Sequence, residues 1–170
     1  MSISIDDVGE AGRPVRPHGP YHVQFGNSQL DYRPGVVEEA VPTGRQLLEA
    51  AGTHPVIEYL AFQVLKDGLL DEVELDETVD LRAPGAEKFL IFRSDRSFEL
   101  ELDGRRYPWG APTITGLALK RLAGVDPIRY GVWQEIRGSD DKKIEDVASA
   151  DLTSAGVERF FTGIIKTTEG

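Results

Sequence analysis

The chain has 170 residues, 40% of them hydrophobic, which is enough for one mid-sized packed domain or two small ones. Its 29 acidic and 19 basic residues give a formal net charge of −10, which argues against general nucleic-acid binding and against docking on anionic membranes. It contains no cysteine, which excludes a disulfide framework, a thiolate metal site and a cysteine nucleophile; this fits the reducing cytoplasm, where we expect the protein to be.

Residues 1–19 have the composition of a flexible tail. They combine the acidic residues Asp6, Asp7 and Glu10 with a cluster of glycines and prolines and show little periodic apolar character. Such a segment buries too little apolar surface to fold by itself. We therefore predict a flexible N-terminal tail here, with a partner-binding arm as the alternative.

The rest of the chain contains an internal repeat, which is its most informative feature. Two ten-residue blocks recur with five identical positions each, at an offset of 72 residues for the first block and 71 for the second. The blocks are residues 43–52 (TGRQLLEAAG) with 115–124 (TGLALKRLAG), and residues 80–89 (DLRAPGAEKF) with 151–160 (DLTSAGVERF). A weaker third similarity joins two alternating strands that run into tight turns, at Gly26-Asn27 and at Asp103-Gly104.

Each copy of the repeat shows the same order of predicted elements. A hairpin is followed by a short helix, an extended run, an acidic irregular stretch and a last strand. In the first copy the hairpin, helix, extended run and last strand are expected at 21–26 with 28–33, 44–51, 56–64 and 87–92. In the second copy they are expected at 97–102 with 105–109, 115–123, 130–136 and 157–163.

The helices carry recognisable start and stop residues. Thr43 and Thr115 can each accept an orphan backbone N–H at the helix start, and Gly52 and Gly124 suit the left-handed position that ends a helix. Both helices are too short to be stable alone, so they must pack their leucines on a sheet. We expect this packing from Leu47, Leu48, Leu117, Leu119 and Leu122.

This order of elements in about 70 residues predicts the β-grasp fold, an α+β unit in which one helix crosses a mixed sheet. The first and last strands lie side by side in the centre of such a sheet. We therefore expect two tandem ubiquitin-like domains at residues 20–93 and 95–163, followed by a mobile C-terminal tail at 164–170. Two ferredoxin-like units are the alternative, although each copy offers only one clear helix.

Several runs of the second half resemble the bacterial multiubiquitin domain family. They are 98–109 (FELELDGRRYPW), 112–116 (PTITG), 122–127 (LAGVDP), Val132-Trp133, Asp151-Leu152 with Phe160-Phe161, and 166–170 (KTTEG). Family members are prokaryotic proteins with several ubiquitin-like β-grasp units in one chain. The resemblance is close over residues 96–170 and looser over 20–93.

The resemblance implies a protein modifier that is conjugated to targets through its C-terminal Gly170. Family members are typically encoded beside an activating enzyme, a conjugating-enzyme-like protein and a JAB-type metalloprotease, so these and unknown target proteins are the implied partners. ATP and Mg²⁺ would belong to the activating enzyme and not to this chain. Glu169 departs from the usual pair of terminal glycines and adds a negative charge beside the reacting end.

The segment between the copies carries no glycine that would end a released first modifier. It reads Arg93-Ser-Asp-Arg-Ser97. We therefore predict that the two domains stay fused and act as one unit.

Other candidate sites are weak. His18, His22 and His54 lack metal-ligand spacing, and the acidic run 67–77 lacks the pattern of a calcium loop. No Gly-rich phosphate loop and no nucleophile–base set is present, so we predict that the chain is not an enzyme and binds no cofactor or metal.

A partner-binding surface is the remaining expectation. Val132 and Trp133 point to opposite faces of a strand, and Phe160 and Phe161 do the same in its neighbour. In the β-grasp, the sheet face away from the helix is the usual docking surface, so we predict partner contacts from Trp133, Val132 and Phe161, with Trp133 filling the core as the alternative. The alternative function is a non-covalent adaptor that binds partners without conjugation.

Overall fold

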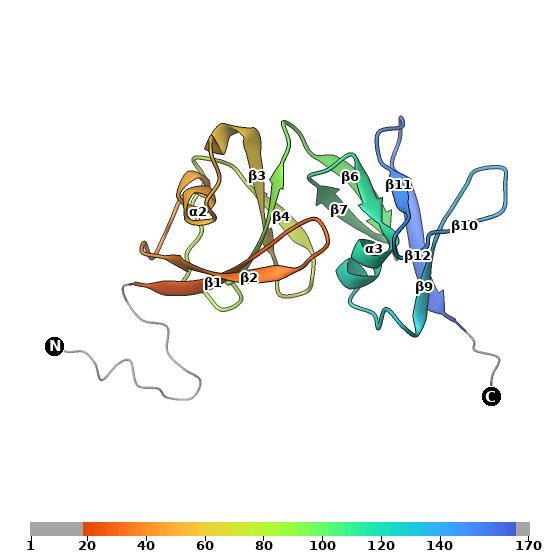
Figure 1. Ribbon diagram of the computed structural model, residues 1–170, viewed down its shortest axis with the longest axis horizontal. Helices are drawn as coiled ribbons and strands as arrows, with labels where there is room; N and C mark the ends of the chain where they lie inside the picture. The colour runs from red at the N-terminus through yellow and green to blue at the C-terminus, as the bar shows by residue number, and fades with distance from the viewer. Residues whose placement is uncertain (1–18, 166–170) are drawn as a thin grey trace.

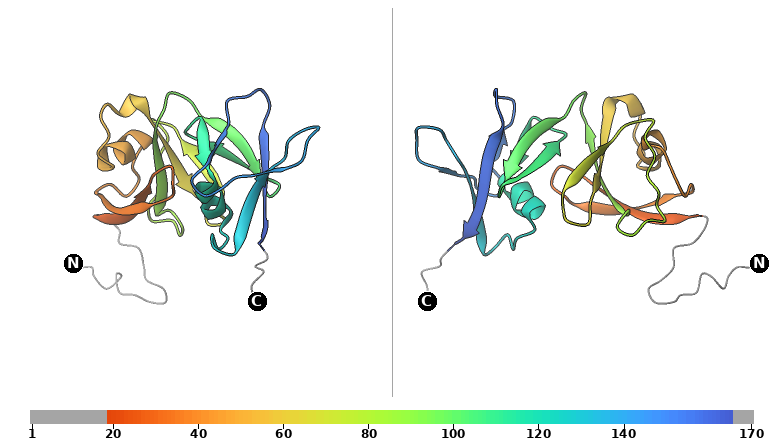
Figure 2. Two further views of the ribbon diagram at one scale, coloured as in Figure 1. Left: turned by 45° about the vertical axis from the view of Figure 1, so that its right-hand side comes forward. Right: turned by 180° about the vertical axis from the view of Figure 1, so that it is seen from behind.

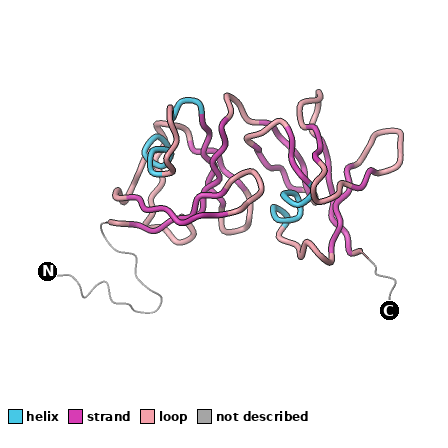
Figure 3. The backbone as a smooth tube through the Cα atoms, viewed as in Figure 1, coloured by secondary structure: helices cyan, strands magenta, loops and turns pink. Residues whose placement is uncertain are grey.

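The computed structural model describes residues 19–165, in which strands and loops predominate and the helices are short (Figure 3). In that range the chain forms two five-stranded mixed sheets, one after the other along the sequence (Figure 1). Each sheet is accompanied by one α-helix, so the predicted α+β fold of two tandem β-grasp units is confirmed. We call strands β1–β5 with their helix the first copy, and β6–β12 with theirs the second copy.

The first copy is built around a pair of parallel central strands. Its elements are β1 (Tyr21–Gly26), β2 (Tyr32–Val37), α2 (Gly44–Ala50), the 3-10 turn η1 (Val56–Glu58), β3 (Tyr59–Val64), β4 (Leu70–Val73) and β5 (Lys88–Arg93). The sheet order is β2-β1-β5-β3-β4, and β1 pairs with β5 in parallel as predicted for the first and last strands.

The second copy repeats this topology with small additions. Its elements are β6 (Phe98–Leu102), β7 (Arg105–Trp109), β8 (Thr113–Thr115), α3 (Gly116–Ala123), β9 (Tyr130–Gln134), β10 (Lys142–Lys143), β11 (Ser149–Asp151) and β12 (Glu158–Ile164). The sheet order is β10-β9-β12-β6-β7, with β6 and β12 parallel. The pairing of β8 with β11 was not predicted; its counterpart in the first copy is a single bridge between Thr43 and Thr78.

Both helices begin in the same way, which explains the repeated Thr-Gly pair. The hydroxyl oxygens of Thr43 and Thr115 accept the backbone N–H three residues later, at 3.2 and 3.1 Å. The next residue, Gly44 or Gly116, lies against main-chain carbonyl oxygens of the loop that crosses the helix start, and a Cβ at either position would collide with them. Only glycine allows this close approach of the two backbones.

The helix ends and the helix packing also follow the prediction. Gly52 and Gly124 adopt φ angles of 85° and 76°, the left-handed conformation expected after a helix. The predicted leucines lie on the sheet and are buried, apart from Leu117, which is only partly buried.

The second strand of the first hairpin was predicted wrongly. We expected it at residues 28–33, whereas β2 spans Tyr32–Val37. The side-chain oxygen of Asn27 accepts the backbone N–H groups of Gln29 and Asp31, at 2.9 and 3.1 Å, and Leu30 takes a φ of 59°. This local network builds a longer loop where the sequence indicated a tight turn.

The two copies do not have separate cores. One cluster of buried residues lies between α2 and the first sheet. The second cluster contains the core of the second copy and also Phe62, Leu70, Leu90 and Phe92 of the first copy. In the views of Figures 1 and 2, α3 and the β6–β7 hairpin lie on the side of the second copy that faces the first. The tandem is therefore held together by apolar packing as well as by its link.

In the range that the structure describes, no helix has the length and apolar character needed to cross a membrane.

Candidate functional site

The predicted partner-contacting residues lie on β9 and β12 of the second copy. Trp133 on β9 is directly opposite Phe161 on β12, and both side chains are partly exposed. Val132 is 0% exposed, because it points to the opposite, helix-covered face. The prediction that Val132 contacts a partner is therefore wrong; it is a core residue.

The predicted conjugation residues Glu169 and Gly170 lie outside the described residues. The last contact described for the chain is the bond from the Ile165 N–H to the carbonyl oxygen of Arg129, at 2.8 Å. The role of Glu169 and Gly170 stays a prediction.

Strand register gives each position on one sheet a counterpart on the other. Phe62 pairs with Leu90 in the first copy as Trp133 pairs with Phe161 in the second. In the next pair on the same face, Leu60 and Phe92 correspond to Gly131 and Gly163. We call the sheet face turned away from the helix the outer face. It carries Leu60, Phe62, Leu90 and Phe92 in the first copy, and Gly131, Trp133, Phe161 and Gly163 in the second.

The outer face of the first copy is covered by the second copy. The ring of Phe92 packs edge-on against Trp109 at 4.9 Å between centroids, and Trp109 is 0% exposed. Next to Trp109, Gly110 lies so close to the Phe92 ring that a Cβ would collide with it. Phe62 and Leu90 are fully buried at the same contact. This face is therefore not available to other molecules.

Two arginines of the second copy border this contact and bind the loops of the first copy. Arg105 donates to the carbonyl oxygen of Asp67 at 2.6 Å. Arg121 donates to the carbonyl oxygen of Gln29 and to the carboxylate of Asp31, both at 2.8 Å. These groups are exposed, and such pairs contribute only about 0–1 kcal/mol each, so they orient the contact more than they stabilise it.

Burial at the contact also perturbs two phenols. Burial raises the pKa of Tyr107, while the nearby charge of Arg105 acts in the opposite direction. Burial likewise raises the pKa of Tyr32 on the first-copy side. Both hydroxyls therefore stay neutral near physiological pH.

The outer face of the second copy carries a partly exposed aromatic pair. The rings of Trp133 and Phe161 are stacked, with 14° between their planes and 5.8 Å between their centroids. A Cβ on Gly131 would lie 3.0 Å from the indole, and one on Gly163 3.3 Å from it, so the outer edge of the indole packs close to both glycines. The ammonium of Lys143 lies 6.0 Å from the indole centroid. We call the Trp133–Phe161 pair the aromatic platform.

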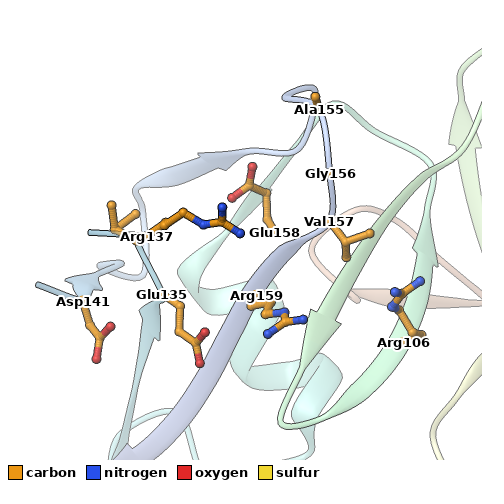
Figure 4. Close-up of a pocket in the computed structure, with 10 residues that line it drawn as sticks. Arg106, Glu135, Arg137, Asp141, Ala155, Gly156, Val157, Glu158 and Arg159 are labelled. Carbon is orange, nitrogen blue, oxygen red and sulfur yellow. The ribbon is translucent and has the colours of Figure 1, made fainter. Parts of the chain in front are cut away.

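A charged hollow of about 840 Å³ lies on the second copy near the platform (Figure 4). Two of its arginines are paired with carboxylates of β6: Arg106 with Glu99 at 3.0 Å, and Arg159 with Glu101 at 3.7 Å. The hollow is lined by Arg106, Glu135, Ile136, Arg137, Asp141, Ala155, Gly156, Val157, Glu158 and Arg159.

The carboxylates of the hollow fall into two groups. Glu158 accepts a hydrogen bond from Gln134 at 2.8 Å, and Figure 4 shows Arg137 extending towards it. Glu135 and Asp141 point in the same direction in Figure 4, away from Glu158. Neither of these two has an ion-pair partner among residues 19–165. Both residues are exposed to solvent.

No metal site emerges from the part of the chain that the structure covers. No three His, Cys, Asp or Glu side chains gather there in a way that could hold an ion. His22 and His54 are exposed, and His18 lies outside the described residues. In the acidic run, the pKa of Glu72 is raised by its partial burial first and then by the charges of Glu74 and its neighbours.

Sequence reasoning missed the contact between the copies, although a signal for it exists. In β5, Phe89 to Phe92 form an unbroken apolar run, which is typical of a strand buried on both faces. The corresponding run in β12 is interrupted by Thr162 and Gly163. The difference between the two copies predicts that only the first sheet is covered on its outer face.

Comparison with known proteins gives one family. The sequence model of the family described as Multiubiquitin matches the chain twice in tandem, over residues 28–94 and 98–164. No curated protein matches the chain.

Proposed function

The chain belongs to the multiubiquitin family, and from this membership we propose that it is a bacterial protein modifier, activated by a partner enzyme and attached to targets through Gly170. The observation that carries the proposal is that both β-grasp copies match the family, one after the other. The proposal assigns the chain no catalytic residue of its own and places the reaction in the cytoplasm, where ATP is present.

The proposed chemistry consumes the terminal carboxylate in three balanced steps. The Gly170 carboxylate attacks the α-phosphorus of ATP, which forms an acyl adenylate and releases pyrophosphate. A thiol of a partner enzyme then displaces AMP and forms a thioester. Finally, a nucleophilic side chain of the target takes the acyl group and releases the thiol. Mg²⁺ and ATP are bound by the activating enzyme.

The position of β12 supports delivery of this end to an enzyme. The strand ends at Ile164, and five residues follow Ile165 in the sequence. Five residues reach at most about 17 Å when fully extended. Glycine at the last position allows a close approach of backbone to a nucleotide. Glu169 restricts the choice to activating enzymes that tolerate a carboxylate beside the reacting group.

The contact between the copies supports a modifier that is transferred as one unit. The link of residues 94–97 contains no glycine, and Phe92 and Trp109 pack against each other on either side of it. We propose that the pair is conjugated intact and is not cut into single domains.

The test uses a purified activating enzyme of the kind encoded beside family members, the full-length chain, ATP and Mg²⁺. We expect pyrophosphate release and a thiol-sensitive adduct whose mass is that of the two proteins less one water. Deletion of Gly170 should abolish the adduct, Glu169→Gln should alter its rate, and Thr167→Ala serves as the matched control. An adduct that forms without Gly170, or no pyrophosphate release from the intact chain, would refute the proposal.

The second candidate function is a non-covalent adaptor, which the exposed aromatic platform favours. An adaptor keeps its partners when Gly170 is deleted, and a modifier loses its conjugates. Mass analysis of complexes recovered with the intact chain and with the deletion variant separates the two, because only the modifier gives covalent products.

A further inference from the structure

A groove of about 510 Å³ lies where the two copies meet. Its apolar part includes Val64 and Leu70 of the first copy and Leu122 of the second. We call it the inter-copy groove. Because both copies contribute to it, the groove exists only while they are in contact.

The charged side chains of the inter-copy groove are mostly cations. Lys66, Lys88, Arg105 and Arg121 line it, and Asp67 is the one carboxylate residue that does so within residues 19–165. This balance is the reverse of that of the whole chain, whose formal net charge is −10. Cations gathered at one surface repel each other, so the groove favours an anionic occupant.

The two lysines are the cations that lack a partner. Both arginines are paired with carboxylates of the first copy, whereas neither Lys66 nor Lys88 has an ion-pair partner in the part of the chain that the structure describes. Both lysines are exposed, and the Lys88 ammonium lies 5.3 Å from the centroid of the Tyr32 ring. The carboxylate of Glu87 belongs to a neighbouring hollow and does not line the groove.

Residues 3–10 of this chain have the matching composition. They read Ile-Ser-Ile-Asp-Asp-Val-Gly-Glu, with three aliphatic side chains, three carboxylates and no basic residue. The aliphatic side chains suit the apolar part of the groove, and the carboxylates suit its lysines. This segment is therefore complementary to the groove in both respects.

The length of the chain allows the segment to reach the groove of its own molecule. β1 runs from the outer end of the first copy towards α3 (Figure 1). Its six residues, Tyr21–Gly26, span about 17 Å, and Gly26 pairs with Tyr32, which lines the groove. Residues 11–19 extend to at most about 30 Å, which exceeds this distance.

We propose that residues 3–10 bind in the inter-copy groove of the same molecule and strap the two copies together. A segment that contacts both copies binds the joined pair better than the separated copies, so it stabilises their contact. The N-terminal arm then acts within the molecule and leaves the second copy's outer face free.

A labelled peptide of residues 1–12 tests whether the groove is the binding site. We expect it to bind a full-length arm variant, whose own arm no longer competes, and not to bind the intact chain. The arm variant carries Asp6→Lys, Asp7→Lys and Glu10→Lys, and these positions precede the described fold. If the peptide binds the intact chain equally well, the groove is open in the native molecule and the proposal is overturned.

Charge reversal in the groove provides the second arm of the test. Lys66→Glu with Lys88→Glu, added to the arm variant, should weaken peptide binding by about tenfold or more, because it replaces attraction by repulsion. Lys142→Glu with Lys143→Glu is the matched control, since it changes the net charge equally at exposed lysines of β10, outside the groove. Equal affinities for the two lysine double variants would overturn the proposal.

A spin label distinguishes the arm of the same molecule from that of another. The chain contains no cysteine, so Ser4→Cys carries a single label. We expect the label to broaden the amide signals of Gly68 and Leu122 in its own chain, and not in an unlabelled, isotope-enriched chain mixed with it. Broadening only in the mixed partner, or none, would overturn the proposal. None of these measurements involves Gly170, so their failure is distinct from failure of the conjugation proposal.

Discussion

Replacement of Phe92 by alanine should uncouple the two copies. Phe92 is 5% exposed and packs edge-on against Phe62 at 5.5 Å and against Trp109 at 4.9 Å. Removing a buried phenylalanine ring costs about 3–5 kcal/mol, including the aromatic contacts and the cavity that is left. A domain of this size is stable by only about 5–15 kcal/mol, so the loss should be large. Because the ring lies between the copies, the loss falls mainly on their contact.

Fluorescence of Trp109 measures this effect directly. In a Trp133→Phe background Trp109 is the single tryptophan of the chain, and it is fully buried beside Phe92. Phe92→Ala should make Trp109 accessible to acrylamide before any denaturant is added, and should lower the unfolding midpoint. Phe89→Ala is the matched control, because it removes the same ring from the same strand on the inner face. It should destabilise the first copy and leave quenching of native Trp109 unchanged.

Two results would contradict the role given to Phe92. If Phe92→Ala costs less than about 1 kcal/mol and Trp109 stays protected from acrylamide, the copies do not share a core as described. If Phe89→Ala exposes Trp109 as much as Phe92→Ala does, the contact depends on the whole first sheet and not on its outer face.

Two further predictions concern single positions. Gly116→Ala should destabilise the second copy by about 1–3 kcal/mol, because the added Cβ collides with the carbonyl oxygen of Glu145. Gly124→Ala should cost less, because its Cβ meets open space and only left-handed backbone strain of about 1–2 kcal/mol remains. Equal melting temperatures for Gly116→Ala and the parent would contradict this prediction. Burial raises the pKa of Tyr107, so the contribution of this phenol to stability is complete below the unfolded-state pKa of about 10 and is lost as pH rises through the folded-state value. Between about pH 9 and 11, urea titrations should therefore show a larger loss of stability for the parent chain than for Tyr107→Phe. Parallel losses in the two proteins would show that this phenol is not the cause.

Local signals in the sequence predicted the fold. Thr115 and Gly116 mark the start of a helix. The Thr115 hydroxyl accepts a hydrogen bond from the backbone three residues later, and Gly116 allows one loop to approach the helix backbone closely. Their recurrence at Thr43 and Gly44 made the duplication visible. The loop after Asn27 was not predictable in the same way, because a positive φ at Leu30 is uncommon for a leucine and is stabilised by a side chain three residues earlier in the sequence.

The candidate site was predicted only in part, because periodicity shows that a strand face is apolar but not what covers it. Phe62 and Trp133 occupy the same position in the two sheets, yet one is buried and the other is partly exposed. The difference comes from the neighbouring copy, which the local sequence of either strand does not report. The close packing of the Trp133 indole depends on Gly131 and Gly163, whose importance becomes apparent only when the strands are paired.

The shared core has a consequence for how this protein can be divided. Either half produced alone would expose Phe62, Leu90 and Phe92, or Trp109, to water. Contiguous apolar surface of this kind promotes aggregation. The smallest portable part of the molecule, for a gene rearrangement or for protein engineering, is therefore the joined pair and not the single repeat.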